Sequence, residues 1–209
     1  MTGREQVAQR PPAVALEGFP TYQLRSAAHV HRAHSRDRGP WWFSSSGEGR
    51  FDLPAPAGTC YLADSPVSAL RERLGTVLGE SPAVPASLLE DAVVSTLSVP
   101  EDVALADLES AAASRFGVIR ELGTMVPYAV PQAWARGFAN AGHGGVRYAP
   151  RFSTGETSSY AVFGPSGASR WPVDLSPVPS ASVPGAPVAL EPPRRWDLTV
   201  VRPPRTRTR

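Results

Sequence analysis

Short apolar segments separated by turn residues recur along the chain. Residues 29–34 and 58–63 have the pattern of short strands, and glycine and aspartate turn signals bound the second of them. The segment between them, residues 39–49, combines glycine and serine with aromatic side chains, which indicates a loop. Further strands are predicted at residues 93–99, 146–148 and 159–163.

A helix is predicted to begin shortly after residue 63. Ser65 is a typical N-cap residue and Pro66 suits the first helical turn, so we expect a helix from there to about Gly79. Its apolar stripe, which should face the core, consists of Leu70, Leu74, Val77 and Leu78. Glu72 lies on the opposite side among small residues, where a ligand or another backbone segment has room to approach.

Two more helices are predicted, at residues 105–115 and 131–141. In the second, Trp134 and Phe138 stand four residues apart and form a core pair. Strands grouped between helices indicate an α+β fold, a single mixed domain with a central β-sheet flanked by helices. A chain of 209 residues with 42% apolar residues can bury such a core without disulfides.

The two ends of the chain differ in composition from its middle. Residues 1–24 are interpreted as a mobile leader, and residues 25–165 as the folded domain. Residues 166–209 are expected to form a Pro/Ser-rich loop, an edge strand at residues 197–201 and a basic arginine tail. From Pro192 onward there are six arginines and one aspartate, but no aromatic stripe accompanies them. We therefore do not expect nucleic-acid binding.

Several classes of protein can be set aside. The single cysteine, Cys60, permits no internal disulfide, and no segment resembles a signal peptide or a membrane span. A cytoplasmic protein without membrane attachment is expected. His29, His31 and His34 lie close in sequence, but strand alternation places His34 on the opposite face, so no metal site is expected.

Three groups of short strings follow one another at defined spacings. They are His31-Arg32-Ala33-His34 with Gly49-Arg50-Phe51-Asp52, then Tyr61-Leu62-Ala63 with Ala69-Leu70-Arg71-Glu72, then Gly144-Gly145-Val146-Arg147-Tyr148 with Tyr160-Ala161-Val162-Phe163. Asp52 precedes Tyr61 by nine residues, and Glu72 follows it by eleven. In this order and spacing, residues 25–165 resemble the RES-domain family.

The resemblance implies a fold similar to that of ADP-ribosyltransferases. RES domains are known as toxins of toxin–antitoxin pairs that degrade NAD⁺ by hydrolysis or phosphorolysis, or that transfer ADP-ribose. The implied function is cleavage of the nicotinamide–ribose bond of NAD⁺, which is the substrate, with no additional cofactor and with an antitoxin as partner. Nicotinamide leaves as a neutral molecule, so one carboxylate suffices where most glycosidases use two.

The resemblance also implies roles for individual residues. Glu72 would stabilise the positive charge that develops on the ribose, and Tyr61 would stack on the nicotinamide ring. Arg32 and Arg50 would clamp the pyrophosphate, because guanidinium groups bind phosphate oxygens in pairs. Two further residues, His34 and Phe43, are expected to line the cleft.

One position departs from the family pattern. The family's serine follows the Gly-x-x-Tyr strand by two residues, and this chain has Pro150 there. Ser153 is the nearest hydroxyl and is the candidate to bind substrate in its place. Two other functions stay open, namely ADP-ribosyl transfer to a protein and a catalytically inactive module that binds a nucleotide or a partner.

Overall fold

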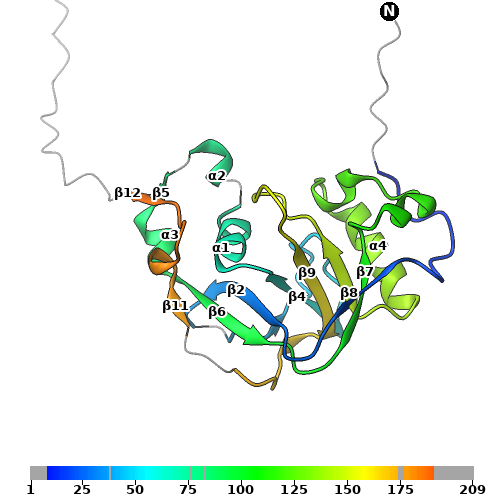
Figure 1. Ribbon diagram of the computed structural model, residues 1–209, viewed down its shortest axis with the longest axis horizontal. Helices are drawn as coiled ribbons and strands as arrows, with labels where there is room; N and C mark the ends of the chain where they lie inside the picture. The colour runs from blue at the N-terminus through cyan, green and yellow to red at the C-terminus, as the bar shows by residue number, and fades with distance from the viewer. Residues whose placement is uncertain (1–8, 38, 76, 82, 174–176, 191–209) are drawn as a thin grey trace, which may run out of the picture.

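The structure is a computed structural model that describes residues 9–37, 39–75, 77–81, 83–173 and 177–190 (Figure 1). Its centre is an eight-stranded sheet in the order β1-β7-β8-β9-β4-β2-β6-β11, in which only β7 and β8 pair in parallel. The strands of this sheet are β1 (Thr21–Leu24), β2 (His29–Ser35), β4 (Ala57–Ala63), β6 (Ala92–Ser98), β7 (Val103–Asp107), β8 (Gly145–Tyr148), β9 (Ser159–Pro165) and β11 (Val178–Pro179).

Helices cover the two halves of the sheet separately. The α-helices are α1 (Pro66–Leu74), α2 (Val77–Glu80), α3 (Ala86–Glu90) and α4 (Ala129–Asn140), and the 3-10 helices are η1 (Ala111–Phe116), η2 (Arg120–Gly123) and η3 (Ser180–Ser182). Helices α1 and α3 pack near β2 and β6, α2 contacts α1, and α4 packs against β8 (Figure 1). The predicted α+β architecture, a central sheet flanked by helices, is confirmed.

The start of α1 agrees with the sequence prediction. The Ser65 hydroxyl accepts a hydrogen bond from the backbone N–H of Ser68, and Pro66 occupies the first turn. The helix ends at Leu74 rather than near residue 79, because Gly75 adopts a positive φ of 55°. The short helix α2 continues the path, and its Val77 and Leu78 still pack against the core beneath α1.

The predicted helix at residues 105–115 is wrong. Residues 103–107 form β7, which pairs with β1 on one side and with β8 on the other, and only η1 follows as a helical turn. Leu105 and Ala106 are fully buried in the sheet. Long-range pairing on both sides therefore overrides the local helical preference of this alanine-rich segment. The other predicted helix is confirmed as α4, with Trp134 and Phe138 in the core.

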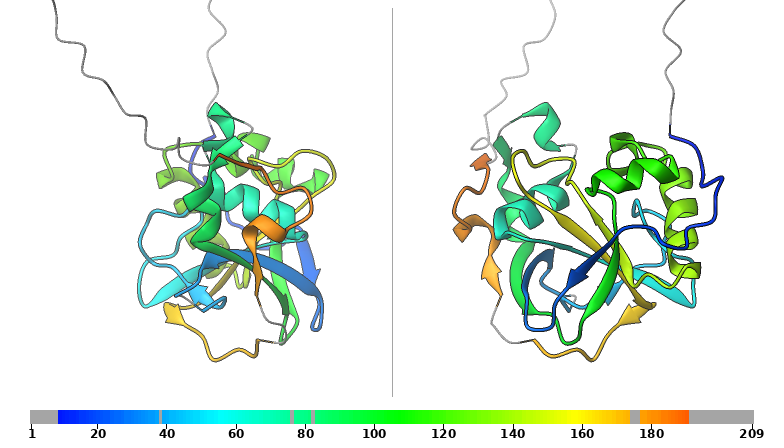
Figure 2. Two further views of the ribbon diagram at one scale, coloured as in Figure 1. Left: turned by 90° about the vertical axis from the view of Figure 1, so that its left-hand side faces the viewer. Right: turned by 45° about the vertical axis from the view of Figure 1, so that its right-hand side comes forward.

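Residues 9–24 are not a mobile leader, which corrects the sequence interpretation. This segment passes beside α4 and enters the large sheet as β1 (Figure 2). Leu16 and Phe19 are buried, and the Phe19 ring lies 4.7 Å from that of Phe138. The indole N–H of Trp134 donates to the carbonyl of Arg10 at 2.8 Å. Apolar burial and these hydrogen bonds fix the segment.

The chain after β9 is more regular than the loop expected there. β10 (Gly167–Ala168) pairs with β3 (Trp42–Phe43), β12 (Val188–Leu190) pairs with β5 (Ala83–Pro85), and β11 lies at the edge of the large sheet beside β6. The edge strand predicted at residues 197–201 and the arginine tail lie outside the described residues. Among the residues that are described, no helix is both long enough and apolar enough to span a bilayer.

Candidate functional site

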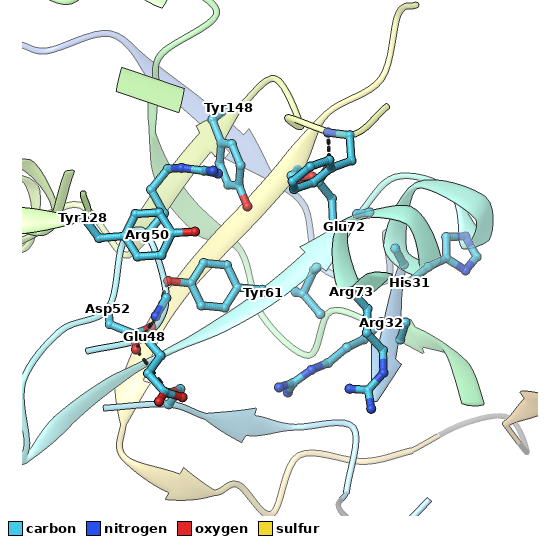
Figure 3. Close-up of a pocket in the computed structure, with 18 of the residues that line it drawn as sticks. His31, Arg32, Glu48, Arg50, Asp52, Tyr61, Glu72, Arg73, Tyr128 and Tyr148 are labelled. Carbon is cyan, nitrogen blue, oxygen red and sulfur yellow. Dashed lines mark hydrogen bonds between the residues drawn. The ribbon is translucent and has the colours of Figure 1, made fainter. Parts of the chain in front are cut away.

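A cavity of about 520 Å³ opens between α1 and the start of α4 (Figure 3). It lies where β4 and β8 end and β9 begins, so segments far apart in sequence meet in its wall. Its volume falls within the range of roughly 300–1,000 Å³ typical of small-molecule sites.

Four residues singled out from the sequence line this cavity: Arg32, Arg50, Tyr61 and Glu72. They belong to β2, to the loop between β3 and β4, to β4 and to α1, respectively. The fold therefore brings together these four of the positions that the resemblance to the RES family implied. Their chemical roles remain predictions.

Asp52 organises the loop of residues 44–52, which we call the Asp52 loop. Its side chain is almost fully buried. Oδ2 accepts hydrogen bonds from the backbone N–H groups of Gly47 and Gly49, each at 3.1 Å. The hydroxyls of Ser44 and Ser46 donate to the same oxygen at 3.2 and 3.4 Å. A single carboxylate thus ties both ends of the loop together.

Helix α4 holds the Asp52 loop from the other side. The side-chain amide of Gln132 donates to the carbonyl oxygens of Gly47 and Gly49 at 2.9 and 3.0 Å. A Cβ atom at position 49 would collide with the side chains of Asp52 and Tyr61. Glycine is therefore required at position 49 for the loop to pack this closely against the cavity wall.

The hydroxyl of Tyr61 is fully engaged by the Asp52 loop. It donates to Asp52 Oδ1 at 2.8 Å and accepts from the backbone N–H of Phe51 at 2.9 Å. Burial, together with the adjacent Asp52 carboxylate, raises the pKa of Tyr61 well above its usual value. The hydroxyl stays protonated and occupied, so the part of Tyr61 available to a ligand is its ring.

Arg50 is a buried cation on the same loop. The residue is only 7% exposed, and its Cζ lies 5.4 Å from the centroid of the Tyr128 ring. Its Nε has no hydrogen-bond partner, and within the described residues no carboxylate forms a salt bridge with it. A buried charge without an anionic partner is costly, and an anionic group of a ligand would supply the missing contact.

Glu72 faces the cavity from α1 and is held by the segment that follows β8. The backbone N–H of Phe152 donates to Glu72 Oε1 at 2.6 Å (Figure 3). Burial raises the pKa of Glu72 above its usual value, while the backbone N–H groups of Phe152 and Arg151 and the charge of Arg50 partly offset this effect. The carboxylate is therefore positioned by the backbone and only partly hydrated.

The opposite end of the cavity is basic. Nη1 of Arg32 donates to the carbonyl oxygens of Pro40 and Trp42 at 2.5 and 2.8 Å, and it lies 3.1 Å from the sulfur of Cys60. Burial raises the pKa of the Cys60 thiol, in keeping with a neutral packing residue. Arg73 of α1 also lines this end of the cavity. One nitrogen of Arg32 thus serves as an anchor for the rest of its guanidinium group.

Three predicted binding residues do not line the cavity, which corrects the expectation from sequence. His34 is buried against β6, with its Nε2 2.8 Å from Ser95 Oγ and its Nδ1 2.9 Å from the Ser35 carbonyl. Phe43 packs edge-on against Trp171 in the core. The Ser153 hydroxyl is buried outside the cavity wall. His34 and Phe43 thus lie in the protein interior, whereas Ser153 is half-buried with its hydroxyl covered.

Most of the residues in the cavity wall were not predicted as site residues, and three of these bear on the chemistry of the cavity. They are Tyr128 at the start of α4, Tyr148 at the end of β8 and Ser159 at the start of β9. Burial raises the pKa of Tyr148 far above its usual value, and the negative charge of Glu72 acts in the same direction. Tyr148 belongs to a quoted motif and could have been proposed from it, whereas no local signal marks Ser159.

The described residues contain no cluster of three or more His, Cys, Asp or Glu side chains suited to holding a metal ion. The cavity wall contains arginines as well as carboxylates held by hydrogen bonds, and these groups lie around a tyrosine ring. This arrangement, on a mixed sheet flanked by helices, defines an α+β domain with a cavity suited to a small polar ligand.

Comparison with known proteins identifies the family. The model of the RES domain matches residues 27–179, and the chain therefore belongs to the RES domain family. The match extends past residue 165, the predicted end of the domain, and includes β10 and β11. Among curated proteins, no sequence matches the chain significantly.

A solved structure shares the fold. A chain from the crystal structure of the M. tuberculosis MbcT–MbcA toxin–antitoxin complex superimposes with a TM-score of 0.54 at 18% sequence identity. The similarity covers 68% of the present chain and 76% of that chain. At this level of identity, the similarity establishes the architecture.

Proposed function

We propose that this protein is an NAD⁺-consuming enzyme that cleaves the nicotinamide–ribose bond. The observation that carries the proposal is the pairing of Glu72 with Arg50 in one cavity, a held carboxylate beside a buried cation that lacks a salt-bridge partner among the described residues. NAD⁺ combines a pyrophosphate with a ribose on which positive charge develops during cleavage. It therefore offers a partner to each group.

The reaction follows from these placements. The bond between ribose C1′ and the nicotinamide nitrogen breaks, and its electron pair leaves with nicotinamide, which becomes neutral. The Glu72 carboxylate stabilises the oxocarbenium-like ribose that remains. An acceptor oxygen then bonds to C1′. Water gives ADP-ribose and releases a proton, whereas inorganic phosphate gives ADP-ribose 1″-phosphate.

The other wall residues support binding rather than proton transfer. Arg50 would contact the pyrophosphate, with Arg32 as a second cation at the basic end of the cavity. The Tyr61 ring would stack on the cationic nicotinamide of the bound substrate, since its hydroxyl is already occupied. No general acid is needed, because the leaving group requires no protonation.

We further propose that the enzyme acts as a toxin held inactive by an antitoxin protein. Support comes from membership of the RES domain family and from the shared fold with a chain of a toxin–antitoxin complex. Expression of this chain alone in a bacterial host should lower cellular NAD⁺ and arrest growth. Co-expression of the protein encoded beside it should restore both.

The direct test uses purified protein. Incubation with NAD⁺ should release free nicotinamide, and mass spectrometry of reactions with and without phosphate will distinguish ADP-ribose from its 1″-phosphate. A labelled protein product would instead identify an ADP-ribosyltransferase. If NAD⁺ binds but stays intact over long incubation, the chain is an inactive binding module.

A further inference from the structure

Some buried polar side-chain atoms of the described residues have no hydrogen-bond partner. In the described part of the chain, four buried side-chain atoms lack a hydrogen-bond partner, and they belong to Arg50, Ser153, Ser159 and Ser180. Two of these residues, Arg50 and Ser159, line the same cavity. Arg50 has an evident use, because it carries a charge. Ser159 is neutral, and the proposed chemistry has so far given it no task.

The sheet fixes the position of Ser159 closely. It is the first residue of β9, where its register partners are Tyr148 on β8 and Ala63 on β4. Directly opposed residues in a sheet point to the same face, so Ser159 lies between a tyrosine and a small side chain that leaves space above it. Ser159 is 1% exposed, yet its Oγ makes no hydrogen bond of acceptable geometry.

The same corner of the cavity contains Glu72. Tyr148 lies between the two groups, because it is the register partner of Ser159 on β8 and lines the cavity together with Glu72. Tyr148 and Glu72 also face one another across the cavity (Figure 3). Ser159 Oγ is thus a neutral group, able to donate and to accept, in the corner where the carboxylate is held.

A buried hydroxyl without a partner destabilises the protein that carries it, since its contact with water is lost without compensation. A ligand group that completes the hydrogen bond removes this cost. The chemistry of the corner narrows the choice of group. An ionised Glu72 only accepts hydrogen bonds, Ser159 can donate or accept, and the anion is already provided for by Arg50. Two adjacent hydroxyl groups suit this pair.

We propose that Ser159 is a substrate-binding residue whose hydroxyl, together with Glu72, binds the vicinal diol of a ribose. This proposal rests on the proposed function, since it names the part of a nucleotide substrate that this corner recognises. It also moves the expected serine contact from Ser153, which lies outside the cavity wall, to the first residue of β9.

The test compares two ligands by titration calorimetry on the full chain. ADP-ribose contains the diol and the pyrophosphate, whereas inorganic pyrophosphate contains only the anion. Ser159→Ala should weaken ADP-ribose binding roughly 3- to 10-fold, the worth of one neutral hydrogen bond, and leave pyrophosphate binding unchanged. The melting temperature of the ligand-free variant should stay the same or rise, because an unsatisfied hydroxyl is removed.

A matched control separates this role from the general effect of removing a buried hydroxyl. Ser180 also has a fully buried, unpartnered hydroxyl, but it lies in η3 away from the cavity. Ser180→Ala should therefore leave both dissociation constants unchanged.

Three results would overturn the assignment of Ser159 while leaving the enzyme proposal intact. They are unchanged ADP-ribose binding in Ser159→Ala, an equal loss for both ligands, and a clearly lower melting temperature. If the wild-type protein binds neither NAD⁺ nor ADP-ribose, the proposed function itself fails, and the assignment of Ser159 falls with it.

Discussion

The two sides of the cavity differ in how completely their polar groups are satisfied. In the Asp52 loop, Asp52 accepts five hydrogen bonds from side chains and backbone, and the Tyr61 hydroxyl both donates and accepts. On the side of Glu72, by contrast, Ser159 Oγ is buried without a hydrogen-bond partner. The Nε atom of Arg50, which extends from the Asp52 loop into the cavity wall, also lacks one. The cavity wall thus combines a fully satisfied hydrogen-bond network with buried polar atoms that lack partners.

This difference separates groups that stabilise the structure of the site from groups that are available to bind a ligand. A closed hydrogen-bond network lowers the energy of the folded chain whether or not a ligand is present. A buried polar group without a partner raises the free energy of the folded chain, and this cost is removed only when a ligand binds. Binding sites are commonly less stable for this reason. Substitutions on the two sides should consequently change different quantities, stability in one case and binding or turnover in the other.

The largest effect is expected for Glu72→Gln. This change keeps the size of the side chain but removes the charge that stabilises the transition state in the proposed reaction, so turnover should fall at least ~10²- to 10³-fold. Binding of intact NAD⁺ should change far less. Nicotinamide release under single-turnover conditions measures the effect. Glu101→Gln, at an exposed position, serves as the control. Normal turnover in Glu72→Gln would remove this residue from the mechanism.

Asp52→Ala should affect stability most. It leaves two backbone N–H groups and the Tyr61 hydroxyl without their acceptor, and the free energy of unfolding should fall by about 3 kcal/mol. Urea denaturation provides the measurement. Asp102→Ala, which removes an exposed pair with Arg25, should cost far less. If Asp52→Ala unfolds like the wild type, the closed network does not stabilise the fold.

Arg50→Met should show the reverse pattern. The dissociation constant for pyrophosphate should rise about 10- to 100-fold, because a charge-assisted contact is lost. The free energy of unfolding should stay constant or increase, since an unpaired buried charge has been replaced by an apolar chain of similar length. Arg120→Met, on the exposed surface of η2, is the matched control. A strong loss of stability in Arg50→Met would show that Arg50 stabilises the folded site.

The smallest effect concerns pH. The raised pKa of Glu72 means that turnover should decline on acidification at a higher pH than for an ordinary glutamate, because the ionised form acts. The contribution of Glu72 to the free energy of unfolding should instead increase on acidification. The proton held by Glu72 favours folding below its usual pKa, and this contribution is lost as pH rises through the raised value.

Glu72→Gln lacks this titration and therefore tests it. The stability of the variant relative to wild type should increase with pH across that interval, as followed by urea denaturation at several pH values. If turnover instead declines on acidification near the pKa of an ordinary glutamate, burial does not raise the pKa of Glu72.

The parts of the structure that could be predicted rest on local signals. Ser65 and Pro66 mark the start of α1, and the resemblance of the local motifs to the RES family implied the four residues from separate elements that meet in the cavity. Residues 103–107 were misassigned because their state is decided by β1 and β8, which lie far away in sequence. Local propensity carries no information about such partners.

The errors at the site have a related origin. Sequence type alone does not reveal which polar side chains are already satisfied inside the protein. His34 has a suitable side chain for a cleft, but Ser95 and the Ser35 carbonyl occupy its ring nitrogens. Ser159 has no distinctive local signal in its strand, and only the joining of β4, β8 and β9 places it in the wall of the cavity.

The packing of residues 9–24 has a consequence for how the protein is made. Gln9 bonds to Gly117 and Glu121, and β1 completes its ladder only with β7, so the first described residues must wait for more than half of the chain to be synthesised. At roughly 5–20 residues per second, this delay lasts on the order of ten seconds. The cavity also requires β9, so its wall cannot close until residue 159 has left the ribosome. A nascent chain therefore has no complete cavity until β9 has emerged, which gives a protein partner time to be present before the first molecule with a complete cavity folds.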